Sequence, residues 1–368
     1  MKKIAPWLLI FPSVIIGILL VELFVRLFMP AMARSEGPSK NFNRVIFFDD
    51  RDSIFENHGD IFTFVAHDEI RNLTAILSDD DFTVEYDYRF RTNNLGLVQD
   101  ADAAPGPDSL LLLGDSFTEG MGAEPWFRLV SPEIARLGYQ PVNGGLLGTG
   151  WQQWLKLERY LAAENLRIRK LVVLFISDDY HRPVWNFTPG ALRCLSVLAT
   201  CRPEESFFYR LPPGDAVPAW IAKVRAARAP MLRKIALNAR AAALLPASYH
   251  VYKYFSSRLR MRIDHGTLDR AEQQSRAAIA ELIRLYGSDN VLFMHLPQKD
   301  EPDHPNETGI MEQAAIRQAG GRLVDGFKSC RMTPADYYPN DDHPNNSGYA
   351  KIAVCVSSAI KQVMPDAR

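Results

Sequence analysis

The sequence lacks several features that would assign a protein to a functional class at once. Its 368 residues carry 42 Lys and Arg against 43 Asp and Glu, so the formal net charge of -1 gives no sign of a nucleic-acid partner. No segment repeats at a fixed period and no low-complexity tract occurs. Hydrophobic residues make up 47% of the chain, which is enough for one large core or for a core with a smaller appendage. Function must therefore be inferred from motifs.

Cysteine is scarce, and its spacing excludes a common metal site. The four cysteines contain no CxxC pair, so a zinc ribbon is not expected, and we predict neither a metal nor another cofactor. If the chain is exported, an even number of cysteines permits disulfides. Cys194 and Cys201 lie close together in a loop-like stretch and are the expected pair. The alternative is that all four cysteines are buried thiols, which includes Cys330 and Cys355.

Residues 1–30 differ from the rest of the chain. Lys2 and Lys3 precede an apolar run from Trp7 to Val21, which continues with two charged interruptions to Met29. About 20 apolar residues span a bilayer, and lysines favour its cytoplasmic side. We therefore expect a signal anchor that spans the membrane, with the remaining chain exported to its periplasmic or extracellular face.

Two further observations bear on this segment. Glu22 and Arg26 are four residues apart, so they can pair on one face of a helix. Small residues at Ala31 and Ala33 fit a signal-peptidase site, which makes a cleaved signal peptide the alternative. Ala33 lies far beyond the uninterrupted apolar run, and this distance favours the uncleaved anchor.

The exported part is predicted to consist of a tether and one large domain. Residues 31–60 are polar and mixed, and we expect them to have little structure. Residues 61–368 form the domain. Alternating runs such as "FTVEYDYRFRTN" predict a small β lead-in over 61–105. An insertion over 185–286 is predicted to be largely helical.

Apolar strands alternate with amphipathic helices through the domain, as in "SLLLLGDS", "RKLVVLFISDDY" and "DNVLFMHLPQ". This order predicts a parallel sheet with helices on both faces, that is, an α/β fold. In such sheets the ligand site forms outside the carboxyl ends of the strands. Ser116, Gly148, Asp178 and the loop of His343 all follow predicted strands and are expected on that rim.

The stretch "LLLGDSFTEGMG", residues 111–122, places Ser116 where an apolar strand breaks off. A nucleophilic serine needs its hydroxyl exposed on a sharp strand-to-helix turn, and glycine neighbours permit that turn. The amide of Ser116, at the start of a helix, can stabilise an oxyanion. The alternative is an ordinary helix start in which Ser116 or Asp115 is the N-cap.

Three motifs in order resemble the blocks of the SGNH, or GDSL-type, hydrolase superfamily. "GDSFTEG" resembles the first block, "VNGGLLGTG" the second and "DDHPNNSGY" the last. The resemblance covers about residues 90–360 apart from the insertion, and "FRTNNLGLV" is similar to a lead-in of membrane-anchored members. It implies a flavodoxin-like three-layer fold, a catalytic Ser116, and an oxyanion amide at Gly148, five residues after Asn143.

The resemblance and the chemistry agree that His343 is the general base. A neutral imidazole accepts the Ser116 proton, and an aspartate on the other ring nitrogen fixes the tautomer. The commoner family pattern places that aspartate three residues earlier, where this chain has Asn340. The third member is therefore either Asp341 or missing, which would leave a dyad. "PDHPNETG" gives His304 a similar context and makes it the alternative base.

The third block departs from the family pattern. Where the family has an asparagine that donates to the oxyanion, "LFISDDY" has Asp178. We expect Asp178 to face the oxyanion and to donate while protonated, because burial beside Asp179 would favour the neutral form. The alternatives are that Ser177 donates instead, that activity is altered, or that both aspartates cap the next helix. Glycan O-acetyltransferase relatives also vary at this block.

Together these observations predict a membrane-anchored, envelope-facing serine esterase or O-acetyltransferase. It would pass an acyl group through acyl-Ser116, and its substrate would be an acylated cell-envelope glycan or lipid. One alternative is a metal-dependent phosphohydrolase that uses Asp115, Asp178, Asp179, Asp341 and His343. Another is a non-catalytic glycan-binding or assembly protein on the same fold, with envelope-assembly proteins as partners.

Overall fold

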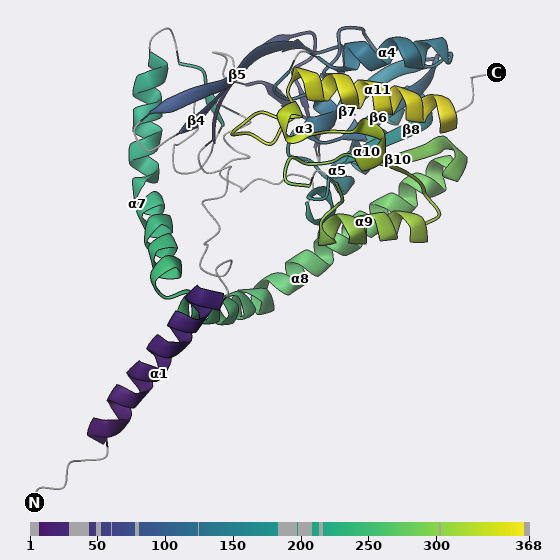
Figure 1. Ribbon diagram of the computed structural model, residues 1–368. Coiled ribbons are helices and arrows are strands. Elements are labelled where there is room, and N and C mark those ends of the chain that lie inside the picture. Colours follow the sequence, from purple (N-terminus) through teal and green to yellow (C-terminus); the bar gives the residue numbers. More distant parts are fainter. Residues whose placement is uncertain are drawn as a thin grey trace, which may run out of the picture. The chain divides into compact units, whose positions relative to one another are not determined.

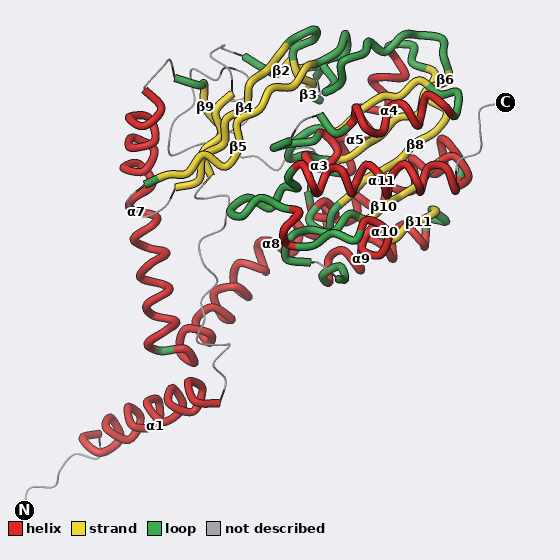
Figure 2. Tube along the Cα trace, turned by 45° about the horizontal axis from the view of Figure 1, so that its top comes forward, coloured by secondary structure: helices red, strands yellow, loops and turns green. Residues whose placement is uncertain are grey.

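The computed structural model describes residues 7–28, 44–48, 53–59, 61–77, 81–123, 125–182, 197, 208–212, 216–301 and 303–363. The chain divides into two compact units, of which one combines Met1–Asn43 with Lys223–Thr267 and the other combines Arg44–Ala222 with Leu268–Arg368. The second unit contains both sheets that matter for the candidate site (Figures 1 and 2).

A five-stranded parallel sheet forms the centre of the second unit. Its strands are β6 (Asp108–Gly114), β7 (Gln140–Gly145), β8 (Arg167–Phe175), β10 (Val291–His295) and β11 (Arg322–Asp325). They lie in the order β7-β6-β8-β10-β11, with every neighbouring pair parallel. Numbered along the chain this order is 2-1-3-4-5, which is the flavodoxin-like order. The central strands β6, β8 and β10 are largely buried because helices cover both faces of the sheet, whereas the edge strand β11 is partly exposed.

Two apolar clusters fix these helices to the sheet. On one face pack α4 (Phe127–Arg136), α10 (Gly326–Cys330) and α11 (Asn346–Val363). On the other face pack α5 (Trp151–Ala163), α9 (Glu307–Gln318) and the carboxyl-terminal part of α8 (Pro246–Tyr286). The predicted α/β fold with helices on both faces is therefore confirmed. Short turns join these elements: α3 (Ser116–Glu119), η2 (Asp179–His181), η4 (Ser288–Asn290) and η5 (Pro334–Asp336).

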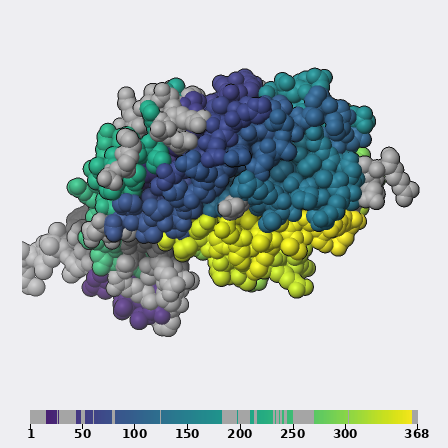
Figure 3. All heavy atoms as spheres, turned by 90° about the horizontal axis from the view of Figure 1, so that it is seen from above, coloured from purple at the N-terminus to yellow at the C-terminus, as the bar shows by residue number. Residues whose placement is uncertain are grey.

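A second, mixed sheet is built from three strands that precede the parallel sheet in the chain and one, β9, that follows β8. It has the order β5-β4-β1-β9, with β1 (Arg44–Phe48), β4 (Glu69–Leu77), β5 (Phe82–Arg91) and β9 (Phe208–Arg210). A small hairpin of β2 (Phe55–Asn57) and β3 (Phe62–Phe64) accompanies it. In Figure 3 the C-terminal segment, in yellow, lies alongside the blue segment that follows β5 in the chain.

The predicted tether is wrong at residues 44–48 and 55–57, because β1 and β2 lie there. The run "RVIFF" is a five-residue apolar strand, and its last four residues are buried between β4 and β9. The strand is too short to stand out in the sequence, because charged residues follow it directly. The lead-in sheet therefore begins at Arg44 rather than at residue 61.

The other unit contains α1 (Trp7–Phe28) and parts of α8 and of α7 (Ala216–Leu244). The carboxylate of Glu22 accepts hydrogen bonds from the amides of Ala247 and Ser248, at 2.8 and 2.7 Å, in the first turn of α8. The side chain of Arg26, its expected partner, lies outside the described residues. Among the residues whose side chains the structure describes, no helix is both long and apolar enough to cross a membrane.

One disulfide joins Cys330 at the end of α10 to Cys355 in α11. From the sequence, the alternative for these two cysteines was that both are buried thiols. The expected pair, Cys194 and Cys201, lies outside the described residues.

Candidate active site

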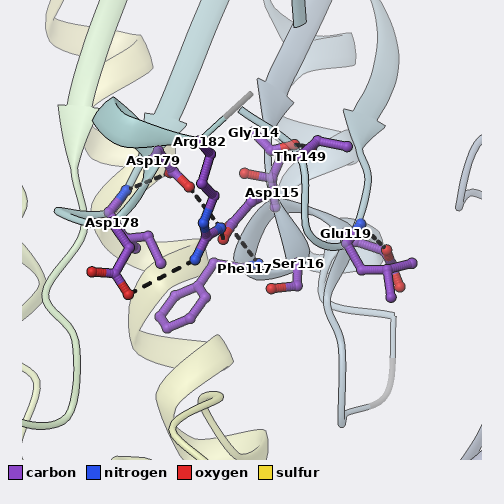
Figure 4. A network of polar contacts seen from close by, with 12 residues as sticks. Gly114, Asp115, Ser116, Phe117, Glu119, Thr149, Asp178, Asp179 and Arg182 are labelled. Atoms are coloured by element: carbon purple, nitrogen blue, oxygen red, sulfur yellow. Dashed lines mark hydrogen bonds and ion pairs between the residues drawn. The ribbon is translucent and has the colours of Figure 1, made fainter. Parts of the chain in front are cut away.

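Ser116 begins α3 directly after strand β6, as Figure 4 shows. A Cβ on Gly114 would lie 1.9 Å from Thr118 Oγ1 and 2.4 Å from the Leu174 carbonyl oxygen, so only glycine fits where the strand turns. Asp115 is the N-cap, and its carboxylate accepts from the Phe117 amide at 2.9 Å. The turn holds Ser116 at the carboxyl end of the sheet, next to the point where the strand order reverses.

The structure brings Ser116, His343 and Asp341 into one hydrogen-bonded chain. Ser116 Oγ lies 2.8 Å from His343 Nε2, and His343 Nδ1 lies 2.9 Å from Asp341 Oδ1. All three residues are buried, and Asp341 has no exposed surface. A carboxylate only accepts, so Nδ1 carries the ring proton and Nε2 is left to accept the serine proton. This is the arrangement that activates a serine nucleophile.

Asp341 is the third member of this chain, rather than Asn340. The Asn340 side chain donates from Nδ2 to Glu85 Oε2 at 3.0 Å, on the edge strand β5. Asp341 accepts from Arg44 Nη2 and from the Tyr86 hydroxyl, each at 2.7 Å. Burial raises the pKa of Asp341, but the charges of His343 and Arg44 and the hydrogen bonds to it hold that pKa well below its usual range. The carboxylate is therefore ionised.

Gly148 lies in the loop after β7, beside the strand that carries Ser116. Its φ of 67° is left-handed, which suits glycine. The neighbouring Thr149 donates to the Leu146 carbonyl at 2.5 Å, and the Leu146 amide donates to the Gly114 carbonyl at 3.1 Å, which fixes the loop to the end of β6. Within the described residues, the amides of Ser116 and Gly148 have no hydrogen-bond acceptor. Both remain able to donate to an oxyanion.

The prediction that Asp178 is buried and faces the oxyanion is wrong. Its side chain is 59% exposed, and its carboxylate lies 3.9 Å from Arg182 Nη2 and 3.4 Å from Gln298 Nε2. Among the described residues, no hydrogen bond or ion pair joins Asp178 to Ser116, Gly148 or His343. β8 ends at Phe175, and the following turn points Asp178 outward, so it lacks the burial that would favour a neutral donor.

Asp179, and not Asp178, is the buried carboxylate of this block. It accepts from the Ile176 amide at 2.9 Å and from Arg182 Nη1 at 2.8 Å. The same nitrogen donates to Asp115 at 2.8 Å, so one guanidinium joins the N-cap of α3 to the turn after β8 (Figure 4). Burial, with the nearby charge of Asp115, raises the pKa of Asp179 well above its usual range. Ser177 is also committed elsewhere, because it donates to Glu301 at 2.7 Å.

Glu119, three residues after the nucleophile, is fully buried and supports the Gly148 loop. Its Oε2 accepts from the Leu147 amide at 2.6 Å. Burial raises the pKa of Glu119 to about 8, and the hydrogen bond from Leu147 opposes that rise only in part. The sequence contained a signal for this residue, because it belongs to the "GDSFTEG" motif.

The other candidate residues do not take part in the hydrogen-bonded chain from Ser116 to Asp341. His304 is exposed, and its Nδ1 lies 3.3 Å from the carbonyl of Pro305. His295 is buried in β10, where burial lowers its pKa to about 3, and it contacts Ser177 and Gln313. Arg44 and Tyr86 were missed, because each is more than 250 residues from Asp341 in the sequence and no local pattern indicates the pairing.

The carboxylates proposed as metal ligands do not converge. Arg182 bridges Asp115 and Asp179, while Asp341 is engaged by Arg44 and His343. Within the part of the chain that the structure describes, no three or more His, Cys, Asp and Glu side chains are arranged to hold a metal ion.

No family model and no curated protein matches the chain. Solved structures similar to it include a lipase/acylhydrolase from Enterococcus faecalis, with 14% identity, covering 72% of this chain and 100% of the other, at a TM-score of 0.37. A putative lipolytic protein of the G-D-S-L family from Desulfitobacterium hafniense has 12% identity, 69% and 99% coverage and a TM-score of 0.35. An acetylxylan esterase from Geobacillus stearothermophilus has 13% identity, 70% and 95% coverage and a TM-score of 0.35. TM-scores this low carry no argument about the fold or the activity. The fold is described from the order of its strands, and the site from its own geometry.

Proposed function

We propose that this protein is a serine acyl hydrolase or acyltransferase of the SGNH, or GDSL, type. The observation that carries the proposal is the Ser116–His343–Asp341 chain, with contacts of 2.8 and 2.9 Å at the carboxyl end of a 2-1-3-4-5 parallel sheet. A non-catalytic binding protein would have no need of this aligned chain, and the carboxylates that a metal phosphohydrolase would use do not converge.

The geometry suggests the steps of the reaction. Ser116 Oγ attacks the acyl carbonyl carbon while His343 Nε2 takes the serine proton, and Asp341 stabilises the imidazolium that forms. The amides of Ser116 and Gly148 stabilise the oxyanion. The imidazolium then returns the proton to the departing alkoxide, which leaves acyl-Ser116. Water, or a sugar hydroxyl in a transferase, attacks this ester with His343 again as the base.

A polar and aromatic cavity of about 780 Å³ next to the Ser116–His343–Asp341 triad supports an acylated glycan as the substrate. Tyr86, Tyr88 and Tyr338 line it together with charged side chains of β4 and β5. The partly exposed rings of Tyr88 and Tyr338 offer flat faces to sugar rings, whereas Tyr86 is buried in the cavity wall, and charged groups bind hydroxyls. Tyr86 also donates to Asp341, so the cavity adjoins the catalytic chain.

The proposal is tested by the kinetics of three variants on a small acyl ester. Ser116→Ala should lower kcat/KM by on the order of 10³-fold or more, and His343→Ala should cost nearly as much. The double variant should be little worse than either, because the pair acts as a unit. His304→Ala is the matched control and should stay near wild type. Full activity in Ser116→Ala would rule out the serine mechanism.

We further propose that residues 1–30 anchor the protein to a membrane and that the α/β domain is exported. The support is Lys2 and Lys3 before the apolar run, and the exposed apolar side chains of α1, such as Leu20 and Phe24. The Cys330–Cys355 disulfide suits an oxidising compartment. The chain should sediment with membranes in high salt and be cleaved by protease only from the outer side. A mature chain that begins at Arg34 would instead indicate a cleaved signal.

A further inference from the structure

Two side chains of the lead-in sheet hold the carboxylate of Asp341. We infer that Arg44 of β1 and Tyr86 of β5 are positioning residues for the catalytic chain, so that the lead-in sheet is part of the catalytic apparatus. The inference rests on the proposed function and adds to it a dependence of the general base on a second sheet.

Both oxygens of the Asp341 carboxylate accept hydrogen bonds. Asp341 Oδ1 accepts from both Arg44 Nη2 at 2.7 Å and His343 Nδ1 at 2.9 Å, and Oδ2 accepts from the Tyr86 hydroxyl at 2.7 Å. Asp341 has no exposed surface, so these donors take the place of water. Burial, together with the charge of Asp341, raises the pKa of Tyr86 well above its usual value. Tyr86 therefore remains a hydrogen-bond donor throughout the working pH range.

The loop that carries Asp341 is held by the same edge strand. Glu85, the residue before Tyr86, accepts from the Asn340 amide at 2.7 Å and from the Asp341 amide at 3.3 Å. Only one residue separates Asp341 from His343, so the carboxylate must turn back to reach the imidazole ring. β5 fixes both the backbone and the carboxylate in that turned position.

Arg44 also changes the electrostatics of the base. A lone carboxylate beside an imidazole favours the charged imidazolium, and a cation on the same carboxylate offsets that effect. Arg44 therefore offsets part of the negative charge that the imidazole ring faces on Asp341. Other charged or titratable groups face the pair from the elements packed around it: Glu85, Tyr86 and Tyr88 of β5, Ser116 of α3, and Tyr338 of the loop.

The test compares pH profiles of kcat/KM on a small acyl ester. Arg44→Gln removes the cation, so the acid limb should move to higher pH by about one unit. Arg44→Lys keeps the charge, so its acid limb should stay with wild type while kcat falls. Tyr86→Phe should lower kcat about tenfold with KM unchanged, because the carboxylate loses a fixed donor.

Matched controls remove contacts of the same kind elsewhere in the domain. Tyr286→Phe deletes a tyrosine–carboxylate hydrogen bond to Glu158, and Arg159→Gln deletes an ion pair with Glu281. Both controls should leave kcat and the acid limb unchanged. If Arg44→Gln and Tyr86→Phe behave like these controls, the two residues are only structural and the inference is overturned.

A second measurement does not depend on turnover. In the full chain with labelled histidines, the ring signals of His343, assigned by their loss in His343→Gln, should move in Arg44→Gln relative to wild type at one fixed pH, because the carboxylate oxygen that accepts from Nδ1 loses its cation. Unchanged ring signals would overturn the inference even in an active enzyme. A wild-type chain without esterase activity would contradict the proposed function instead, and the ring signals would still decide the role of Arg44.

Discussion

At the scale of single residues, burial separates the roles of neighbouring aspartates on the catalytic rim. Asp341 has no exposed surface and is held ionised by the donors around it. Asp178 is 59% exposed and pairs only loosely with Arg182. Asp179, the next residue, is buried and joined to Arg182 at 2.8 Å. Residue type alone suggests one role for all three, whereas their surroundings give each a different one.

The exposed position of Asp178 predicts that its charge has little part in catalysis. Asp178→Asn keeps the shape and removes the charge, and kcat/KM on a small acyl ester should change less than about threefold across pH, since no contact joins this residue to Ser116. A tenfold or larger gain would instead identify Asp178 as an oxyanion donor. Loss of activity would identify it as a required base or ligand.

The buried Glu119 predicts a pH-dependent stability. Its pKa is about 8 in the folded chain against 4.5 ordinarily, so between these values the unfolded chain loses a proton that the folded chain keeps. The contribution of Glu119 to folding stability is thus complete below about pH 4.5 and is lost as pH rises through 8. The free energy of unfolding of wild type relative to Glu119→Gln should fall by on the order of 4 kcal/mol between pH 4.5 and 8.5.

Denaturant unfolding at several pH values measures this difference directly. Taking the difference from Glu119→Gln cancels the titration of other buried groups, such as His295. Glu164→Gln, at an exposed site, is the control and should give a difference that does not vary with pH. If the difference in free energy of unfolding between wild type and Glu119→Gln also does not vary with pH, the Glu119 carboxyl keeps its usual pKa in the folded protein.

At the scale of elements, α11 joins the catalytic loop to the core. The helix begins three residues after His343, and the hydroxyl of its Tyr349 donates to the Met121 carbonyl, in the loop after α3, at 3.0 Å. Its buried face packs on the sheet beside α4. The Cys330–Cys355 disulfide ties the same helix to α10. Movement of α11 would therefore displace His343 relative to Ser116.

The disulfide should contribute measurably to stability. Its ends are 25 residues apart, and a closed loop of that size stabilises a fold by about 3 kcal/mol. The Cys330→Ala, Cys355→Ala double variant should lose about that much free energy of unfolding. A non-reducing digest of wild type should yield a linked peptide that contains both cysteines. If no such peptide forms, the two cysteines are thiols in the protein.

The sequence predicted β6, β8 and β10 of the parallel sheet because each is a continuous apolar run with a clear end. It did not predict the edge strand β11, which has only four residues and none of them fully buried. It also predicted Ser116, His343 and Gly148 as rim residues, since each follows such a strand or a recognisable block. It could not predict which carboxylates are buried. The direction of Asp178 and Asp179 depends on a turn whose geometry is set by Arg182, a residue that no motif singled out.

At the scale of the whole molecule, the candidate site draws on the two larger sheets of the unit that contains it. The parallel sheet supplies Ser116 and the rim, and the lead-in sheet supplies Arg44 and Tyr86 to Asp341. Contacts across 255 and 297 residues of chain form only in the folded state, so no local pattern could reveal them. A domain reduced to the parallel sheet and its helices would lack these two donors.

The most direct measurement of the central claim is the intact mass of the protein after reaction with a fluorophosphonate, followed by peptide mapping. The account predicts a single adduct on Ser116, absent in Ser116→Ala and formed at least 100-fold more slowly in His343→Ala, because the imidazole activates the serine. His304→Ala should react at the wild-type rate. A folded wild-type chain that forms no adduct, or one that carries the adduct on another residue, would contradict the account.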